Sequence, residues 1–260
     1  MIDFVKLSSS GISKIFYLDS VDSTNKFAKT EVTDDNVLIV AGFQSKGRGR
    51  FERSWQSDKG KNITVTLVKM LDISKVHLVN FYTSYIILRA LKEITSANAS
   101  GSEGLFRLKW PNDVLLNSKK IAGVLTELVN INENPKKFII GLGVNVNQDS
   151  FPEEISHKAT SLKKIFGADF SVNEVINTVI KCFYENLMLL EQESILMELW
   201  RLNTDIFGRE VSFRVTENSE ELKGEVVEIA DDGGIKIKIS DNNNSKKIST
   251  YYTGEISFIY

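Results

Sequence analysis

Apolar positions along the chain recur in two patterns, one with period two and one with a period close to 3.6. The continuous run VLIVAGF (37–43) and the alternating run NITVTLVKM (62–70) predict strands. From Ser74 to Ala97 apolar residues recur at helical spacing and predict a long, mostly buried helix. Together these patterns indicate an α+β domain. Further strands are predicted over 14–18, 105–110, 113–117, 121–131 and 137–147, and further helices over 23–32 and 171–203.

Polar residues mark the ends of several of these elements. STN (23–25) places hydroxyl residues where a helix N-cap is expected. Ser171 and Glu174 match a capping box, and the long helix after them has a candidate break near Gln192. The pair Asn117-Ser118 lies between two predicted strands and indicates a hairpin turn.

Past Gly208 the pattern changes to short strands at close spacing. A tight turn, DDGG (231–234), separates two of them. Five short strands within about fifty residues are typical of a small closed β-barrel. We therefore predict two domains, residues 1–206 and residues 207–260. The strands expected in the second domain are 211–215, 222–230, 234–240, 246–252 and 255–260.

Bulk composition restricts the class of protein. Of 260 residues, 32 are Lys or Arg and 34 are Asp or Glu, which gives a net charge of −2. Nucleic-acid and membrane-surface binders usually have a basic excess, so we expect no DNA and no membrane as partner. The single cysteine, Cys182, excludes a disulfide within the chain and indicates a reducing compartment. Since the sequence shows neither a signal-peptide pattern nor a long apolar run, we predict a cytoplasmic protein.

The segment GFQSKGRGRFERSW (42–55) stands out against this nearly neutral background. It has four cationic residues, three glycines and no aliphatic residue. Its glycines match neither a Walker loop nor a dinucleotide-binding fingerprint, because the required Lys-Ser/Thr pair and third glycine are absent. Nothing indicates a His-based zinc site, because His77 and His157 are far apart in the sequence. The chain also lacks the GxSxG elbow of many serine hydrolases.

Five polar or basic segments lie at the ends of the predicted strands. Each alone has an ordinary structural explanation, such as a helix cap, a solvated loop, a turn or a hairpin arm. Together they lie where sheets present loops to ligands, and they suit a ligand with several phosphates or a phosphate beside a carboxylate. The segments are STN (23–25), QSKGRGR (44–50), KWPND (109–113), KKIAG (119–123) and GLGVNVN (141–147). The associated cations are Lys46, Arg48, Arg50, Arg53, Lys109 and Lys120.

The order of these segments resembles the biotin protein ligases, or biotin–[acetyl-CoA-carboxylase] ligases. STN, QxxGRGR with a Trp soon after, KWPND, KxAG and GxGxNVN follow in that family's order between about Asp19 and Asn147, and TGEIS (253–257) adds a weaker match. The resemblance implies a catalytic domain similar to class II aminoacyl-tRNA synthetases, followed by an SH3-like barrel. Only about twenty residues precede STN, so a form without the family's N-terminal DNA-binding domain is expected.

The resemblance also implies a reaction in two steps. Biotin's carboxylate attacks the α-phosphate of ATP, in the presence of Mg²⁺, and gives biotinyl-5′-AMP and pyrophosphate. A lysine of a biotin carboxyl carrier protein, part of acetyl-CoA carboxylase or a related carboxylase, then attacks this anhydride and releases AMP. Both a monomer and a homodimer agree with the sequence.

The resemblance assigns roles residue by residue. Biotin is expected to contact Ser23, Thr24, Asn25, Gln44, Gly47, Arg48, Lys120 and Gly123. ATP is expected to contact Arg50, Arg53, Trp55, Lys109, Asn112 and Asn145. The expected catalytic residues, which would offset repulsion between the two reacting anions, are Lys120, Arg48, Arg50 and Lys109. Mg²⁺ prefers oxygen ligands, and the candidate for placing it is Asp113.

One position departs from the family pattern, and two other functions stay open. The family's loop usually has glycine where this chain has Glu52, which adds strain if that position needs a positive φ. A lipoate–protein ligase, related in fold, also activates its cofactor acid as an adenylate, although KWPND and GRGR favour biotin. A non-enzymatic RNA-binding module, with GRGRFER as its contact loop, is the alternative from another class.

Overall fold

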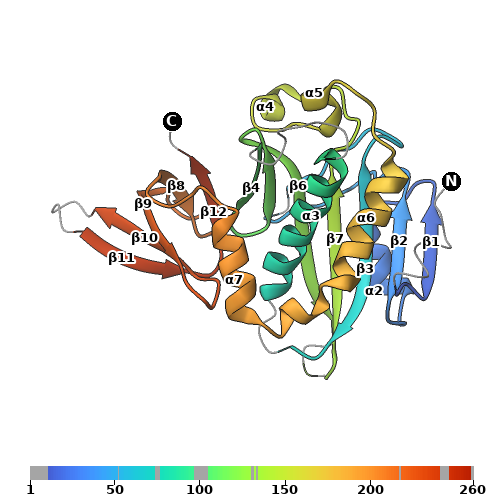
Figure 1. Cartoon of the computed structure of the whole chain (residues 1–260), viewed down its shortest axis with the longest axis horizontal. Coiled ribbons are helices and arrows are strands. Elements are labelled where there is room, and N and C mark those ends of the chain that lie inside the picture. Colours follow the sequence, from blue (N-terminus) through green and yellow to red (C-terminus); the bar gives the residue numbers. More distant parts are fainter. Residues whose placement is uncertain are drawn as a thin grey trace.

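The computed structural model of the chain describes residues 11–51, 53–73, 77–96, 105–129, 132, 134–216, 218–240 and 246–258. Its larger sheet has seven strands in the order β1-β2-β3-β7-β6-β5-β4 (Figure 1). β1 and β2 are parallel, whereas all other neighbouring strands are antiparallel. Each strand predicted up to residue 147 is present, with its ends shifted by at most a few residues. The strands are β1 (Lys14–Leu18), β2 (Val37–Ala41), β3 (Ile63–Leu71), β4 (Phe106–Lys109), β5 (Asp113–Leu116), β6 (Lys119–Val129) and β7 (Lys136–Val144).

Helices cover both faces of this sheet, which confirms the predicted α+β class (Figure 1). α2 packs against β2, β3 and β7, while α3 packs against β4, β5 and β6 and is itself covered by α6 and α7. None of the helices in the described ranges has both the length and the apolar character needed to cross a bilayer. The helices are α2 (Thr24–Glu31), α3 (Leu78–Ser96), α4 (Glu153–Ser156), α5 (Leu162–Phe166), α6 (Val172–Glu185), the 3₁₀ helix η2 (Leu187–Leu190) and α7 (Glu193–Leu202).

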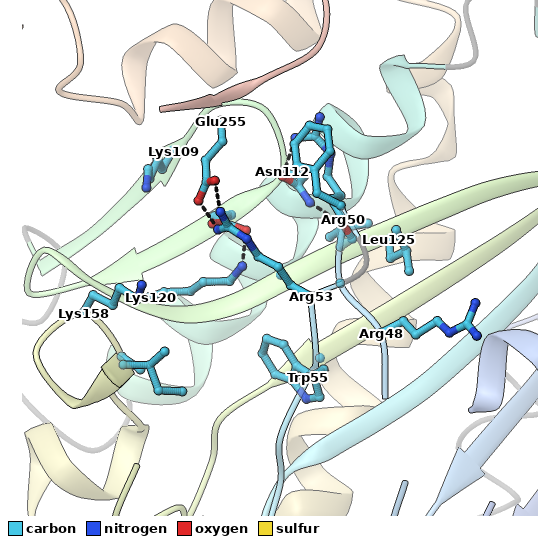
Figure 2. Close-up of a pocket in the computed structure, with 18 of the residues that line it drawn as sticks. Arg48, Arg50, Arg53, Trp55, Lys109, Asn112, Lys120, Leu125, Lys158 and Glu255 are labelled. Carbon is cyan, nitrogen blue, oxygen red and sulfur yellow. Dashed lines mark hydrogen bonds and ion pairs between the residues drawn. The ribbon is translucent and has the colours of Figure 1, made fainter. Parts of the chain in front are cut away.

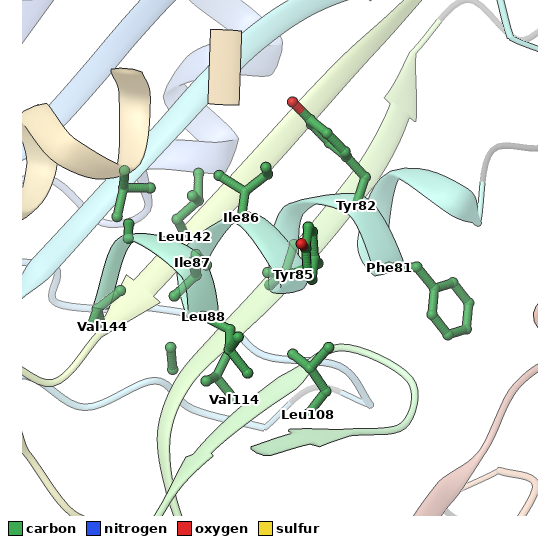
Figure 3. Packing of buried hydrophobic residues seen from close by; sticks show 14 of the residues in the cluster. Phe81, Tyr82, Tyr85, Ile86, Ile87, Leu88, Leu108, Val114, Leu142 and Val144 are labelled. Carbon is green, nitrogen blue, oxygen red and sulfur yellow. The ribbon is translucent and has the colours of Figure 1, made fainter. Parts of the chain in front are cut away.

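α3 runs through the centre of the hydrophobic core (Figure 3). Its side chains, such as Ile86, belong to the same buried cluster as Leu142 of β7. Most of α3 is buried because the sheet lies on one side of it and two helices lie on the other. The predicted long helix is thus confirmed over Leu78–Ser96, whereas positions 74–76 and 97 lie outside the described residues.

The predicted caps and turns are present. The hydroxyl groups of Ser23 and Ser171 each accept a backbone N–H in the first turn of the helix that follows. Asn117 and Ser118 both have positive φ in the turn between β5 and β6, as a tight two-residue hairpin requires. The predicted break in the long helix is also confirmed, because η2 separates α6 from α7 and Gln192 immediately precedes α7.

The C-terminal part forms a second sheet of five antiparallel strands in the order β11-β10-β9-β8-β12. Within the described residues β11 and β12 remain as two open edges, so the sheet is not closed and the expected barrel is not observed. The expected domain boundary at residues 206 and 207 falls between α7 and β8. The strands are β8 (Glu210–Arg214), β9 (Leu222–Ile229), β10 (Ile235–Ser240), β11 (Lys246–Tyr251) and β12 (Glu255–Phe258).

The turn at 231–234 joins this second sheet to the first part of the chain. The buried indole N–H of Trp110 donates to the Gly233 carbonyl at 3.0 Å. Gly233 has a φ of +80°, and a Cβ there would lie 2.7 Å from the Phe81 ring, so the turn needs glycine at this point. A turn of the second sheet is therefore hydrogen-bonded to Trp110 of the KWPND segment.

Candidate active site

A cavity of about 630 Å³ brings the predicted segments together. Its walls are the large sheet, the first turn of α2, the basic loop (residues 43–59, between β2 and β3), the segment between β7 and α5, and β12. Arg48, Lys109 and Lys120 all line it, with Arg48 on the side opposite the two lysines (Figure 2). The predicted residues that line it are Ser23, Thr24, Asn25, Gln44, Arg48, Arg50, Arg53, Trp55, Lys109, Asn112, Asp113, Lys120, Gly123 and Asn145.

The basic loop closes on itself through backbone hydrogen bonds. At its base the Gly60 N–H donates to the Gly42 carbonyl at 2.9 Å, and farther along the Trp55 N–H donates to the Gly47 carbonyl at 2.9 Å. Gly47 does not line the cavity, and a Cβ there would lie 2.5 Å from the Trp55 carbonyl. Its role in this structure is to let the two arms of the loop approach each other. Glu52 lies outside the described residues.

Three glycines form a floor without side chains, which we call the glycine floor (Gly123, Gly141 and Gly143). Gly123 and Gly143 are opposite each other on β6 and β7, and Gly141 lies two residues earlier on the same face. A Cβ on Gly143 would lie 2.5 Å from the Trp55 ring, and a Cβ on Gly141 would lie 2.4 Å from Asn25 Oδ1. The glycines of the GLGVNVN segment therefore leave the space that the Trp55 and Asn25 side chains occupy.

Lys120 and Asp113 form an ion pair on this floor, with 2.6 Å between Nζ and Oδ1. Gly123 leaves space for the pair, because a Cβ there would lie 3.0 Å from Lys120 Cε. The Lys120 N–H donates to the Lys158 carbonyl at 2.8 Å, and the ammonium lies 5.9 Å from the centre of the Trp55 ring. These contacts fix Lys120 in the cavity.

The acidic residues of the cavity do not form a ready-made metal site. Asp113 pairs with Lys120, and Glu255 pairs with Arg53. In the part of the chain that the structure describes, no three His, Cys, Asp or Glu residues are grouped so that they could hold a metal ion. A Mg²⁺ ion that is already bound to phosphates needs only one or two protein carboxylates. The role of Asp113 toward Mg²⁺ therefore stays a prediction.

Two arginines of the basic loop contact the second sheet. Arg50 donates to the Gly254 carbonyl and to Thr253 Oγ1, both at 3.2 Å. Arg53 forms a bidentate ion pair with Glu255 of β12 (Figure 2). Sequence reasoning missed Glu255, although the TGEIS segment that contains it was matched to the family.

Lys109 ends β4 beside other positive charges (Figure 2). Burial lowers the pKa of Lys109; Asp113 opposes this lowering, whereas the charges of Lys120 and Lys158 add to it. The charged Lys109 ammonium therefore lowers the free energy of unfolding, and a bound anion would offset this loss of stability.

The substitution Lys109→Met is expected to leave the melting temperature unchanged or to raise it by about 2–4 °C, since a half-buried charge among other cations costs on the order of 1 kcal/mol. In the wild type the pKa of Lys109 is lower in the folded chain than in the unfolded chain, so the unfolded chain keeps the Lys109 proton to higher pH. Stability should therefore rise with pH between the two pKa values, and this rise should shrink in the variant. Calorimetry from neutral to alkaline pH measures both effects, and a lower melting temperature in the variant would contradict them.

The first turn of α2 and Gln44 form another part of the cavity wall. The backbone N–H and the hydroxyl of Thr24 lie 2.7 and 3.0 Å from Gln44 Oε1. Because a backbone N–H can only donate, the Gln44 amide has its oxygen toward Thr24 and its NH₂ group free of that contact. Asn25 uses its amide hydrogens on a backbone carbonyl and on Glu127. Ser23 and Gln44 thus keep donors for a ligand, whereas the Asn25 amide is committed to the protein.

Asn112 and Asn145 are buried in the walls. Asn112 donates to a carbonyl of β6 and accepts from Arg50 at 3.4 Å. Asn145 donates through its side chain to the Thr160 carbonyl at 3.0 Å and through its backbone to Ile121 at 2.8 Å. Both residues therefore tie the strands to the loops that surround the cavity, and contact with ATP stays a prediction.

Residues 151–159, which include α4, form a wall that sequence reasoning missed. It adds Lys158 as a cation of the cavity, whereas Lys46, which we expected among the cations, does not line it. No motif marks this segment, and its position follows from the backbone pairing of Lys158 with Lys120, which is a tertiary contact. Its residues in the cavity wall are Phe151, Ile155, His157, Lys158 and Ala159.

Comparison with known proteins shows the family to which the chain belongs. The model of the Biotin/lipoate A/B protein ligase family matches residues 17–145. The solved structure of the biotin protein ligase from Aquifex aeolicus in complex with biotin and ATP is similar with a TM-score of 0.77 and 30% identity, over 95% of this chain and 99% of that chain. The chain belongs to the biotin protein ligase family. Its motif order had predicted this family.

Two curated members of the biotin protein ligase family align with part of the chain. The bifunctional ligase/repressor BirA of Bacillus spizizenii is 33% identical over 177 residues, 65% of this chain and 52% of that protein. The biotin–[acetyl-CoA-carboxylase] ligase of Mycobacterium tuberculosis is 30% identical over 150 residues, 56% of this chain and 52% of that protein. The chain thus spans about half the length of these biotin protein ligases.

Proposed function

We propose that the chain is an ATP-dependent biotin protein ligase that forms biotinyl-5′-AMP from biotin and ATP. The observation that carries this proposal is the charge distribution of one cavity. Among the described residues that line it, six are Lys or Arg and two are carboxylates, which leaves an excess of four positive charges. This excess suits a polyphosphate beside a carboxylate, and the Aquifex aeolicus relative was solved with biotin and ATP.

The first step must bring two anions into contact. At about 4 Å and an effective dielectric constant near 20, two like unit charges repel by roughly 4 kcal/mol. Lys120 would lie at the carboxylate and the α-phosphate, with Asp113 holding its ammonium at 2.6 Å. The carboxylate oxygen forms a bond to the α-phosphorus, and the bond to pyrophosphate breaks. Arg50, Arg53 and Lys109 would bind the phosphates.

Trp55 is proposed to stack on the adenine. Its ring lies against the glycine floor at Gly143 and beside Lys120. The indole N–H of Trp55 is buried without a hydrogen-bond partner among the described residues, so the ring would meet a ligand through its face rather than through this N–H. Asn112 and Asn145 would form the polar surroundings of the nucleotide.

The orientation of Gln44 favours biotin over lipoate. With its oxygen held by Thr24, Gln44 offers an NH₂ group, and Ser23 offers a hydroxyl, to the head group of the acid. The ureido group of biotin has a carbonyl oxygen that accepts from such donors, whereas a dithiolane ring has no comparable acceptor. Arg48 would contact the chain of the same molecule from the side of the cavity opposite Lys120.

For the second step we propose a lysine of a biotin carboxyl carrier protein as the acceptor. The neutral amine attacks the acyl carbon of the anhydride, forms an amide, loses a proton, and AMP leaves. The carrier would belong to acetyl-CoA carboxylase or a related carboxylase, as the name of the Mycobacterium tuberculosis relative suggests. Mg²⁺, when bound with ATP, would neutralise phosphate charge, and Asp113 is the residue that would help to hold it.

Exchange of labelled pyrophosphate into ATP tests the first step directly. Label should enter ATP when biotin is present and should not enter when biotin is omitted. Lipoate in place of biotin is the matched control and should support no exchange. Exchange that occurs with lipoate but not with biotin would select the lipoate–protein ligase alternative. Absence of exchange with both acids would refute the proposed activity.

A further inference from the structure

A polar network connects the rim of the sheet to the end of the cavity where α2 begins. Glu127 of β6 is not among the residues that line the cavity. One carboxylate oxygen of Glu127 accepts from Asn25 Nδ2 at 2.9 Å, and the other pairs with Lys29. Asn25 and Lys29 are four residues apart on α2, so a single carboxylate holds two successive turns of this helix.

Asn25 is held from two further directions. Its Nδ2 also donates to the Leu125 carbonyl at 3.2 Å, and its Oδ1 accepts from Thr66 Oγ1 at 2.6 Å. Thr66, Gly141 and Leu125 are opposite one another on β3, β7 and β6. Asn25 therefore spans three strands above Gly141, and its amide has fixed directions for both donors and for its acceptor.

The network continues to the atoms that face the cavity. Thr66 Oγ1 lies 2.8 Å from Thr24 Oγ1, and Thr24 in turn contacts Gln44 Oε1. Asn25, Thr24 and Thr66 are 7%, 3% and 0% exposed, so water cannot replace these contacts without opening the site. The direction of the donors on Ser23 and Gln44 thus depends on how firmly the first turn of α2 is held.

We propose that Glu127 is a positioning residue for the neutral head group of the acid substrate. By holding Asn25 it fixes the first turn of α2, and with it the donors of Ser23 and Gln44. This inference rests on the proposed function, because the head group is that of biotin. Glu127 touches no reacting atom, and the side chains assigned to the nucleotide, such as Arg50, Trp55 and Lys109, lie on the basic loop and on β4. Glu127 should therefore act on affinity for the acid alone.

The variant Glu127→Ala is expected to weaken biotin binding by about tenfold, because Asn25 loses a charged acceptor. Titration calorimetry with biotin alone measures this, while the KM for ATP and kcat at saturating biotin should stay within about twofold of wild type. Glu127→Gln keeps an oxygen for Asn25, and Lys29→Met removes only the exposed ion pair. Both should bind biotin within about twofold of wild type, because an exposed ion pair contributes little.

Glu228→Ala is the matched control, because it removes a partly exposed carboxylate that pairs with Lys236 in the second sheet. The proposal would be overturned if Glu127→Ala bound biotin as tightly as this control does. It would also be overturned if Glu127→Ala lost as much affinity for ATP as for biotin.

A second variant is available if Glu127→Ala does not fold. Thr66→Val removes the next hydroxyl in the network and should also weaken biotin binding, and unchanged biotin affinity in this variant would overturn the proposal. A wild-type protein that binds no biotin would instead count against the proposed function.

Discussion

Methionine in place of Lys120 is expected to slow biotin-dependent pyrophosphate exchange by about 10²–10³-fold. The variant loses the cation that we propose lies beside the reacting anions, and it leaves the Asp113 carboxylate without its ion-pair partner. The KM for ATP should change less than kcat, because Arg50, Arg53 and Lys109, the residues proposed to bind the phosphates, still line the cavity. Steady-state exchange kinetics at varied ATP separate the two parameters.

Lys119 provides the control for this prediction. It precedes Lys120 on β6 but does not line the cavity, so Lys119→Met should exchange at nearly the wild-type rate. An exchange rate for Lys120→Met within about tenfold of wild type would contradict the assigned role.

A methyl group on the glycine floor is expected to have the second large effect. The added Cβ of Gly143→Ala would lie 2.5 Å from the Trp55 ring. The indole must therefore leave the position from which we propose that it stacks on adenine. Overpacking of this kind costs about 1–3 kcal/mol, and we expect the KM for ATP to rise by about tenfold or more. Biotin affinity, measured without ATP, should change little.

The companion variant is Trp55→Ala. If the clash with the indole causes the defect, Gly143→Ala should add almost nothing once Trp55 has been replaced, and the two effects should be strongly non-additive. Fully additive losses in the double variant would show that Gly143 acts in some other way, and the stacking role of Trp55 would lose its support.

Local rules were enough to predict the parts of the fold that depend on neighbouring residues. The cap at Ser23 involves a backbone N–H three residues later, and the turn at Asn117 and Ser118 joins two adjacent strands. The strands of the large sheet were predicted because a run that is buried on both faces has no polar alternation, as in Val37–Ala41. Motif order gave the family and most of the residues that line the cavity.

Contacts between distant segments could not be predicted in the same way. The pattern past Gly208 shows how many short strands occur, but closure depends on whether the outermost strands pair, and β11 and β12 do not. Lys158 joins the cavity only because its carbonyl accepts from Lys120, and Glu255 only because Arg53 reaches it. Likewise, the partners of Asn25 on β6 and β3 follow from tertiary contacts that no local rule predicts, and its expected contact with biotin stays a prediction.

The attachment of the basic loop to β12 matters for anyone who would divide this chain into two pieces. A cut between α7 and β8 looks convenient, because it falls between the two sheets. Yet it would leave Arg50 and Arg53 on one fragment and their anchors, Gly254 and Glu255, on the other. If these arginines bind the nucleotide as proposed, nucleotide binding would require both fragments, which would make this cut suitable for a complementation reporter and unsuitable for preparing an independent catalytic half.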